Sequence, residues 1–172
     1  MRSLRISIFF LGILGFSLWT FLSGCDSQTD ENRYIEEVVG EYRFNTFEFV
    51  PESSVLPPVN VLDTLVTEET RLQLFSSARF TLLYRFIGDD PAFVGGDFQA
   101  TKSRVILKGN KEDEKFYVAL LLPIEIELSR HPDNPDLLTA AIKRRVNLEA
   151  FSPRYKGLLS VRGTLVLELE RQ

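Results

Sequence analysis

"RFTLLYRFIGDDPAFVGGDFQATK", residues 79 to 102, is the stretch that sets the fold class. Its first part alternates with a period of two, because successive side chains of a strand point to opposite faces. One face then carries four large apolar side chains: Phe80, Leu82, Tyr84 and Phe86. The "GDDP" from Gly88 to Pro91 supplies a turn. The pattern predicts an antiparallel hairpin of Arg79–Ile87 and Phe93–Lys102, with a bulge or sharp bend at Gly95 and Gly96.

Further strands are predicted on both sides of this hairpin. Gly40 to Val50 is rich in Tyr, Phe and Thr, and Thr70 to Phe75 alternates. Gly157 to Leu169 closes the chain as an amphipathic strand with Leu165, Leu167 and Leu169 on its inner face. Residues 137 to 151 fit either a helix or an extended segment in their first half, so their structure stays open.

A second hairpin is predicted to join Ser103–Lys108 to Lys115–Leu122 through the charged loop "GNKEDE". From Phe116 to Leu128 the apolar residues keep one phase. Pro123 has no N–H to donate to a ladder. The segment therefore predicts two strands, or one strand bent at Pro123.

Counting gives eight or nine strands and hardly a helix in about 130 residues. Consecutive hairpins of this kind either stack as a β-sandwich or close as an up-and-down barrel. Closure removes exposed strand edges. We therefore expect an all-β fold, an antiparallel up-and-down barrel of about eight strands, with a β-sandwich as the alternative.

The N-terminus has the pattern of an export signal. Arg2 and Arg5 precede an uncharged apolar run from Ile6 to Leu22, which is the layout of a secretory signal, although a run of this length can also form a membrane-spanning helix. Leu22-Ser23-Gly24-Cys25 resembles the lipobox of bacterial lipoprotein signal peptides, in which the cysteine is acylated and becomes the first residue. We expect 1–24 to be a signal peptide, 25–33 a lipidated N-terminus with a polar tether, and 34–172 a single domain.

The interpretation of Cys25 as a lipidated residue predicts where the protein is located and which partners it has. Acyl chains on Cys25 would hold the protein in membrane lipid, outside the cytoplasm, on the cell membrane or the outer membrane. Cys25 is the only cysteine, so no disulfide is expected within the domain. Without Arg2 and Arg5, 18 basic side chains stand against 24 acidic ones, a formal charge of −6. This balance argues against nucleic acid as a partner.

The mature chain also resembles the lipocalin-like lipoproteins of bacteria. It has a polar tether, a helical turn over Tyr34–Val39, the Gly-x-aromatic opening Gly40-Glu41-Tyr42 and meandering strands. In lipocalins an arginine from the final strands covers the aromatic residue of that opening, and Arg162 or Arg171 stands in the matching region. The resemblance implies a barrel and an apolar pocket.

No catalytic or cofactor chemistry is predicted. His131 is the only histidine, and it stands in a proline-flanked loop without a serine or cysteine motif nearby. Asp89-Asp90 and Asp133-Asn134-Asp136 carry oxygen ligands, but their spacing matches no calcium loop, and such residues are common turn formers. We expect no enzyme, no metal and no cofactor.

The shared phase of the predicted strands suggests one continuous apolar face inside the barrel. If that interior is hollow, the face would bind a small apolar ligand through seven residues: Phe80, Leu82, Tyr84, Phe86, Phe116, Val118 and Leu120. If it is filled, these side chains form a core. The two functions that follow are ligand binding and, as the alternative, a cell-envelope protein interaction or scaffold module without a pocket. The basic run at residues 143 to 156 suggests contact with anionic lipid headgroups beside the anchor, or a solvated strand face.

Replacing Cys25 with alanine should abolish fatty acid incorporation, because no other side chain of the chain offers a thiol for the thioether. Metabolic labelling of cells with an alkyne fatty acid measures this directly. Ser27→Ala, two residues away, should keep the label. A labelled Cys25→Ala protein, or a mature chain that begins elsewhere than residue 25, would contradict the assignment.

Overall fold

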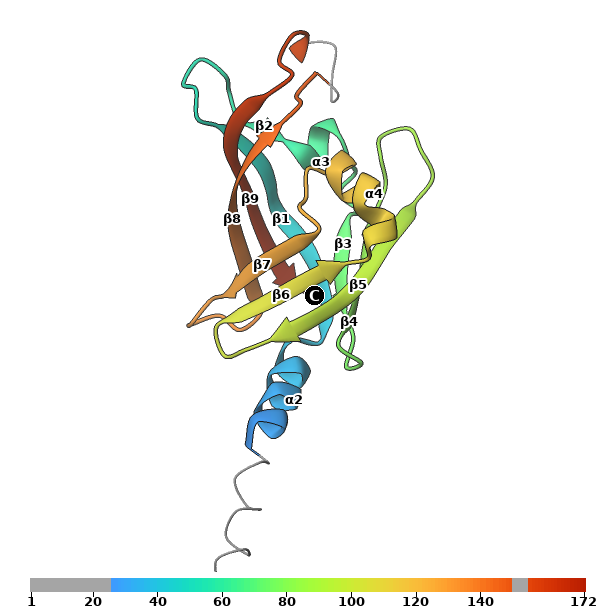
Figure 1. Ribbon diagram of the computed structural model, residues 1–172, viewed down its shortest axis with the longest axis vertical. Helices are drawn as coiled ribbons and strands as arrows, with labels where there is room; N and C mark the ends of the chain where they lie inside the picture. The colour runs from blue at the N-terminus through green and yellow to red at the C-terminus, as the bar shows by residue number, and fades with distance from the viewer. Residues whose placement is uncertain (1–25, 150–154) are drawn as a thin grey trace, which may run out of the picture.

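The computed structural model describes residues 26–149 and 155–172 and consists mainly of strands (Figure 1). The predicted signal segment and Cys25 lie outside the described residues. The strands are β1 (Gly40–Pro51), β2 (Val59–Asn60), β3 (Arg71–Leu74), β4 (Arg79–Tyr84), β5 (Ala92–Ala100), β6 (Arg104–Gly109), β7 (Glu125–Arg130), β8 (Leu137–Val146) and β9 (Val161–Arg171). The helical segments are α2 (Asp26–Val38), α3 (Val61–Thr64), the 3₁₀ turn η1 (Lys111–Asp113) and α4 (Glu114–Ala119).

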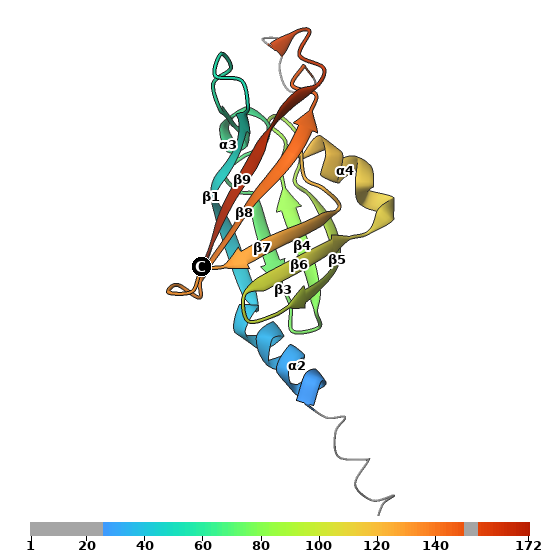
Figure 2. The same cartoon turned by 60° about the vertical axis from the view of Figure 1, so that its left-hand side comes forward.

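The strands form a closed antiparallel barrel. Their order is β1-β3-β4-β5-β6-β7-β8-β9, and β9 pairs back onto β1, with β2 as a two-residue addition beside the end of β1. Apart from the β1–β9 pairing that closes the ring and the short β2, strands that are neighbours in space are neighbours in sequence (Figure 2). The prediction of an eight-stranded up-and-down barrel is confirmed, and the pairing of β1 with β9 excludes the sandwich.

The hairpin of β4 and β5 forms as predicted, and Phe80, Leu82 and Tyr84 of β4 are buried inside the barrel. Of the two expectations at Gly95 and Gly96, a bulge or a sharp bend, the bulge is wrong, since the ladder from Arg79↔Asp97 to Tyr84↔Ala92 keeps one register. A Cβ at Gly96 would instead collide with the backbone of Lys108 and Gly109 on β6. Glycine is needed there for close strand approach. The register shift lies in β1, between Phe44 and Thr46.

The predicted strand over residues 115 to 122 is wrong. η1 precedes this segment, α4 covers it as far as Ala119, and β6 pairs instead with β7, from Lys108↔Glu125 onward. Acidic side chains in the first turns, Glu112 and Glu114 among them, suit the positive end of a helix. The helix ends with N–H groups of Leu121 and Leu122 bonded to carbonyls of Val118 and Tyr117 (3.0 and 2.8 Å), and with Leu121 at a φ of +62°.

The open segment from 137 to 151 is extended over its first ten residues. Leu137–Val146 forms β8, which pairs along its whole length with β9, from Leu137↔Glu170 to Val146↔Val161. Leu138, Ala140 and Val146 of this strand are buried. Buried residues in this segment are thus spaced by two, as in a strand that has one face in the core.

Helix α2 sits at one end of the barrel and is longer than the predicted turn at Tyr34–Val39. It buries Ile35 and Val38 against the barrel. The buried Tyr42 on β1 donates its hydroxyl to the carbonyl of Val38 at 2.9 Å, and burial raises the pKa of this phenol. Packing of these apolar side chains explains why a mostly polar helix forms here.

Arg171, near the end of β9, stands opposite Tyr42 in the ladder of β9 and β1. Its Nη1 donates to the carbonyls of Glu37 (3.0 Å) and Val39 (3.3 Å), where α2 ends. Its Nε donates to Asp136 at 2.6 Å, and Nη2 pairs with the same carboxylate. Arg171 thus joins α2, β9 and the β7–β8 loop, while Arg162 is exposed.

Glu37 joins α2 to Arg130, the last residue of β7. Its carboxylate accepts from Arg130 Nη2 at 2.9 Å and from Arg33 Nε at 3.1 Å. The Arg130 side chain is only 9 % exposed and also donates to the carbonyl of Thr101 at 2.9 Å. The hydrogen bond from Arg130 holds the pKa of Glu37 below its ordinary value, against a smaller opposing effect of burial.

Replacing Arg171 with methionine should lower the free energy of unfolding by about 2 kcal/mol, because charge-assisted hydrogen bonds to Asp136 and to the end of α2 are lost. Arg162→Met on the same strand is the matched control and should change stability by less than about 0.5 kcal/mol. Urea denaturation of both variants measures the difference. If Arg171→Met and Arg162→Met are equally stable, the hydrogen bonds of Arg171 to Asp136 and to the end of α2 do not stabilise the fold.

The Glu37 ion pair should make stability depend on acidity. A carboxyl whose pKa is lower folded than unfolded contributes stability above its unfolded value of about 4.3, and this contribution is lost as the pH falls through the folded value. The stability difference between wild type and Glu37→Gln should therefore be largest near neutral pH and shrink below about pH 4. Unfolding curves across pH test this, with the exposed Glu36→Gln as control. A constant difference at all pH values would contradict it.

Candidate binding site at the open end of the barrel

The interior of the barrel is apolar and filled. The cavity left between its side chains measures about 10 Å³, close to the minimum for a single water molecule. It is lined by Phe44, Leu72, Phe80, Leu82, Leu107, Leu122, Ile126, Leu128, Leu167 and Leu169. A barrel of eight strands is narrow enough for side chains to fill it. This interior cavity, lined by residues of the described part of the chain, is too small for an organic ligand.

The segment that follows α4 fills the upper part of the barrel. Leu120, Leu121 and Leu122 are all buried, although they are consecutive. The ring of Tyr117 packs over Gly109, and its hydroxyl donates to the carbonyl of Gly95 at 3.3 Å. Burial raises the pKa of this phenol, so it stays protonated. Helix α4 and its leucines therefore act as a plug between β6 and β7.

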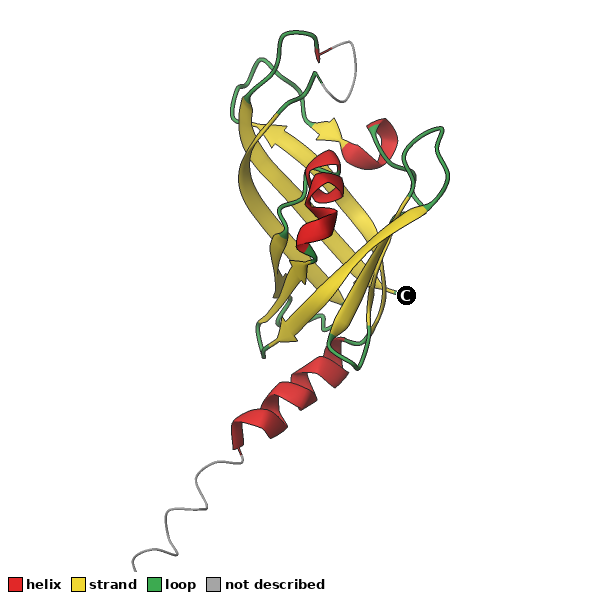
Figure 3. Ribbon diagram, turned by 45° about the vertical axis from the view of Figure 1, so that its right-hand side comes forward, coloured by secondary structure: helices red, strands yellow, loops and turns green. Residues whose placement is uncertain are grey.

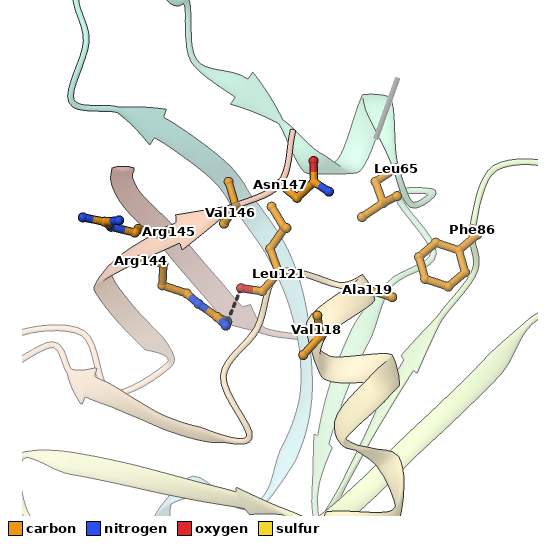
Figure 4. A pocket seen from close by; sticks show the side chains of 9 residues that line it. All are labelled: Leu65, Phe86, Val118, Ala119, Leu121, Arg144, Arg145, Val146 and Asn147. Atoms are coloured by element: carbon orange, nitrogen blue, oxygen red, sulfur yellow. Dashed lines mark hydrogen bonds between the residues drawn. The ribbon is translucent and has the colours of Figure 1, made fainter. Parts of the chain in front are cut away.

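The end of the barrel opposite α2 carries α3 and α4 (Figure 3). A pocket of about 350 Å³ remains there, above the plug (Figure 4). We call it the rim pocket. Its lining residues are Leu65, Phe86, Val118, Ala119, Leu121, Arg144, Arg145, Val146 and Asn147. They come from α4, from the end of β8, and from the chain beside β3 and β4. Most of the side chains are apolar, as in sites for small organic ligands.

Arg144 stands in the rim pocket where the apolar lining meets the end of β8. Its side chain points toward Leu121, and its Nη1 donates to the Leu121 carbonyl at 2.5 Å (Figure 4). The residue is half-buried, and desolvation lowers the pKa of its guanidinium from the ordinary value. Arginine nevertheless stays charged at neutral pH. The rim pocket thus combines apolar walls with one partly desolvated cation.

The adjacent Arg145 differs from Arg144 in direction. It is exposed, and Figure 4 shows its side chain pointing away from the pocket centre. This follows from strand geometry, because neighbouring residues face opposite sides of the sheet. Arg145 therefore borders the pocket from the outer surface of β8.

The seven residues of the predicted ligand face do not form one surface. Phe80 and Leu82 line the filled interior, and Tyr84 and Leu120 are buried. Phe116 is half-buried on α4, where the Lys115 ammonium lies 4.8 Å from the centre of its ring. Phe86 and Val118 alone of the seven line the rim pocket. The ring of Phe86 also contacts that of Tyr84 edge to face, with centroids 5.2 Å apart.

The remaining lining residues were not predicted. Leu121 and Ala119 were assigned to a strand that does not form, and the end of β8 was ambiguous in sequence. The signal that could have found Arg144 is its two-residue spacing from Leu138, Ala140 and Ile142. Only one basic side chain stands in that alternating row.

The basic run at residues 143 to 156 does not lie beside α2. β8 runs from Asp136 and Arg171, next to α2, toward the opposite end, so Lys143 and the residues after it up to 149 are remote from the predicted anchor (Figure 1). Residues 150–154 lie outside the described residues. The suggested contact with headgroups beside the anchor does not fit this arrangement.

His131, the candidate base considered from the sequence, does not line the rim pocket. His131 is exposed, and its Nδ1 accepts from the N–H of Asp133 at 3.3 Å. Among residues 26–149 and 155–172, no three His, Cys, Asp or Glu side chains group as ligands for a metal ion. Nor does this part of the chain contain a helix with the length and apolar character to cross a bilayer.

Comparison with protein-family models and with curated proteins finds no match to this chain.

The plug can be tested by truncating two residues of the same segment. Leu122→Ala should lower the free energy of unfolding by about 2–5 kcal/mol, because Leu122 is 1 % exposed and its loss leaves a cavity in a packed core. Val118→Ala, at 58 % exposure, should cost less than about 0.5 kcal/mol. Thermal or urea unfolding separates the two outcomes. Similar losses at both positions would instead favour the single-phase strand.

Proposed function

We propose that the protein is a bacterial lipoprotein, anchored outside the cytoplasm through Cys25, whose barrel binds a small apolar ligand without catalysing a reaction. The anchor is supported by the lipobox-like Leu22-Ser23-Gly24-Cys25. Binding is supported by the rim pocket, whose volume of about 350 Å³ falls in the range of about 300–1,000 Å³ found for ligand sites. That pocket is the observation that carries the proposed function.

The position of α2 supports an orientation for the anchored protein. α2 begins at Asp26, the residue after Cys25, and joins the barrel at the end that Arg171 closes. The rim pocket, α3 and α4 lie at the other end (Figures 1 and 3). A helix of 13 residues extends about 20 Å at 1.5 Å per residue. The pocket would therefore open away from the membrane that holds the lipid.

The filled interior favours the rim over the barrel centre as the ligand site. A ligand at the predicted inner face would have to displace Leu120 and Leu122, which are fully buried. Expelling them would forfeit their packing, which costs several kcal/mol for large core side chains. The rim pocket is open without such a rearrangement, so binding there needs no unfolding of the plug.

Ligand binding can be measured on the chain of residues 26–172. All strands of the closed barrel and α2 lie within it, so the fold needs no part of the anchor. It should bind the neutral fluorescent probe N-phenyl-1-naphthylamine with one-to-one stoichiometry. Ala119→Trp should abolish binding, because the indole would occupy the pocket.

Val55→Trp is the matched control, since Val55 is 86 % exposed and does not line the rim pocket. It should bind the probe as wild type does. Wild-type protein without probe binding, or an Ala119→Trp variant that binds normally, would contradict the ligand-binding function. Circular dichroism of both variants checks that each retains the barrel.

The alternative, an envelope interaction or scaffold module, is favoured by two observations. The barrel interior is filled, and apolar side chains are exposed at the end away from α2, including Val55, Ile87, Val118 and Leu159. Exposed apolar residues that gather in one region mark interaction sites. A photoreactive amino acid at residue 55 or 159 in intact cells would crosslink a protein if this function holds. Absence of crosslinks at both positions would exclude contact through these loops.

A further inference from the structure

Arg144 interrupts an apolar row inside the barrel wall. The inner face of β8 presents Leu138, Ala140, Ile142, Arg144 and Val146, spaced by two residues. Opposite Arg144 on β9 stands Gly163, which has no side chain to contact it. A charged residue in the inward phase of a strand is unusual and costs solvation energy unless it is paired. The protein therefore retains a cation where packing alone would favour an apolar side chain.

The contacts of Arg144 do not neutralise it. Among the described residues, its side chain has one hydrogen bond, to the Leu121 carbonyl, and takes part in none of the ion pairs. No acidic residue lines the rim pocket within that part of the chain. A guanidinium has five N–H donors in a planar fork. Most of its donors remain available to a bound molecule.

We propose that the rim pocket binds a single-chain amphiphile with an oxyanion headgroup, a carboxylate or a phosphate, and that Arg144 holds that headgroup. The inference rests on the proposed ligand-binding function and names its ligand class. The arginine fork matches the two oxygens of either headgroup.

The apolar part of the pocket takes the tail of the ligand. Leu65, Phe86 and Val118 line the side of the pocket toward α3 and α4, while Arg144 lies toward β8 (Figure 4). The two kinds of surface therefore lie at different sides of one cavity. A volume of about 350 Å³ is at the low end for ligand sites, so one alkyl chain fits the space better than a two-chain lipid.

The experiment compares four ligands with the same alkyl chain on the chain of residues 26–172, below their micelle concentrations: dodecanoate, dodecyl phosphate, 1-dodecanol and dodecylammonium. Affinity is measured by displacement of N-phenyl-1-naphthylamine. At least one of the two anions should bind about tenfold or more tightly than the alcohol, since hydrogen bonds to a charged group gain that much. The anion that does so identifies the headgroup. The ammonium should bind more weakly than the alcohol.

Two variants place the preference at Arg144. Arg144→Met should remove the difference between anion and alcohol while the alcohol still binds. Lys143→Met, at an exposed position on the outer face of β8 that does not line the rim pocket, should keep the difference. If Arg144→Met fails to fold, Arg144→Lys keeps the charge without the fork and should reduce the preference. The four-ligand series on wild-type protein tests the anion preference without any variant.

Three results would overturn the inference. If anions and alcohol bind wild-type protein equally, the headgroup site is absent while the proposed function stands. If the preference disappears in Lys143→Met and survives in Arg144→Met, the anion binds on the outer surface of β8. If none of the four ligands binds and the neutral probe does not bind either, the proposed function itself fails.

Discussion

The pairing of β1 with β9 is the constraint on which the rest of this structure depends. It joins the first and last long strands over the register from Tyr42↔Arg171 to Pro51↔Gly163. Closure satisfies the backbone groups that an open sheet would expose at its edges. It also brings residues from the two ends of the chain together, so Arg171 reaches Tyr42 and the last carbonyls of α2. Gly163 allows the close approach, since a Cβ there would collide with the Phe49 ring and the Val50 carbonyl.

The barrel has two different ends as a result. At the end held by Arg171, hydrogen bonds and ion pairs join α2, the β7–β8 loop and Arg130 into one polar cluster above a buried tyrosine. At the other end, leucines after α4 enter the barrel and leave a pocket above them. Side chains fill the centre of the barrel, so a closely packed apolar core takes the place of a deep cavity there. The rim pocket lies at that end, beside the partly desolvated Arg144.

Patterns of period two predicted the parts of this fold that form regular strands. β4 and β5 alternate cleanly, and so does β9, because each has one face in the core and one in solvent. The same reasoning failed at residues 115 to 122. Phe116, Val118, Leu120 and Leu122 alternate by sequence, but Leu121 is buried as well and ends a helix at positive φ, where glycine is the usual residue. The glycine that usually marks such a helix end is absent here, and Pro123, which can also follow a helix, fits a bent strand equally well.

The candidate site was harder to predict than the fold, since it combines residues distant in the chain. Phe86 and Val118 were predicted to share one apolar strand face. Both line the rim pocket, but Phe86 forms an isolated bridge with Val66, and Val118 lies on α4. Arg144 carried no local motif, and its charge suggested a solvated surface. Its inward direction follows from the register of β8 against β9.

The sequence by itself determined that the chain is rich in strands, that its hairpins follow one another, and that Leu22-Ser23-Gly24-Cys25 has the form of a lipidation motif. These features are local, since each depends on residues a few positions apart. Only the tertiary structure decided that β9 closes on β1, that α4 plugs the interior, and that Arg144 lies beside apolar walls. Those outcomes depend on how side chains far apart in the chain pack together in the limited volume of the barrel. A short stretch of sequence does not contain all the residues that share this volume.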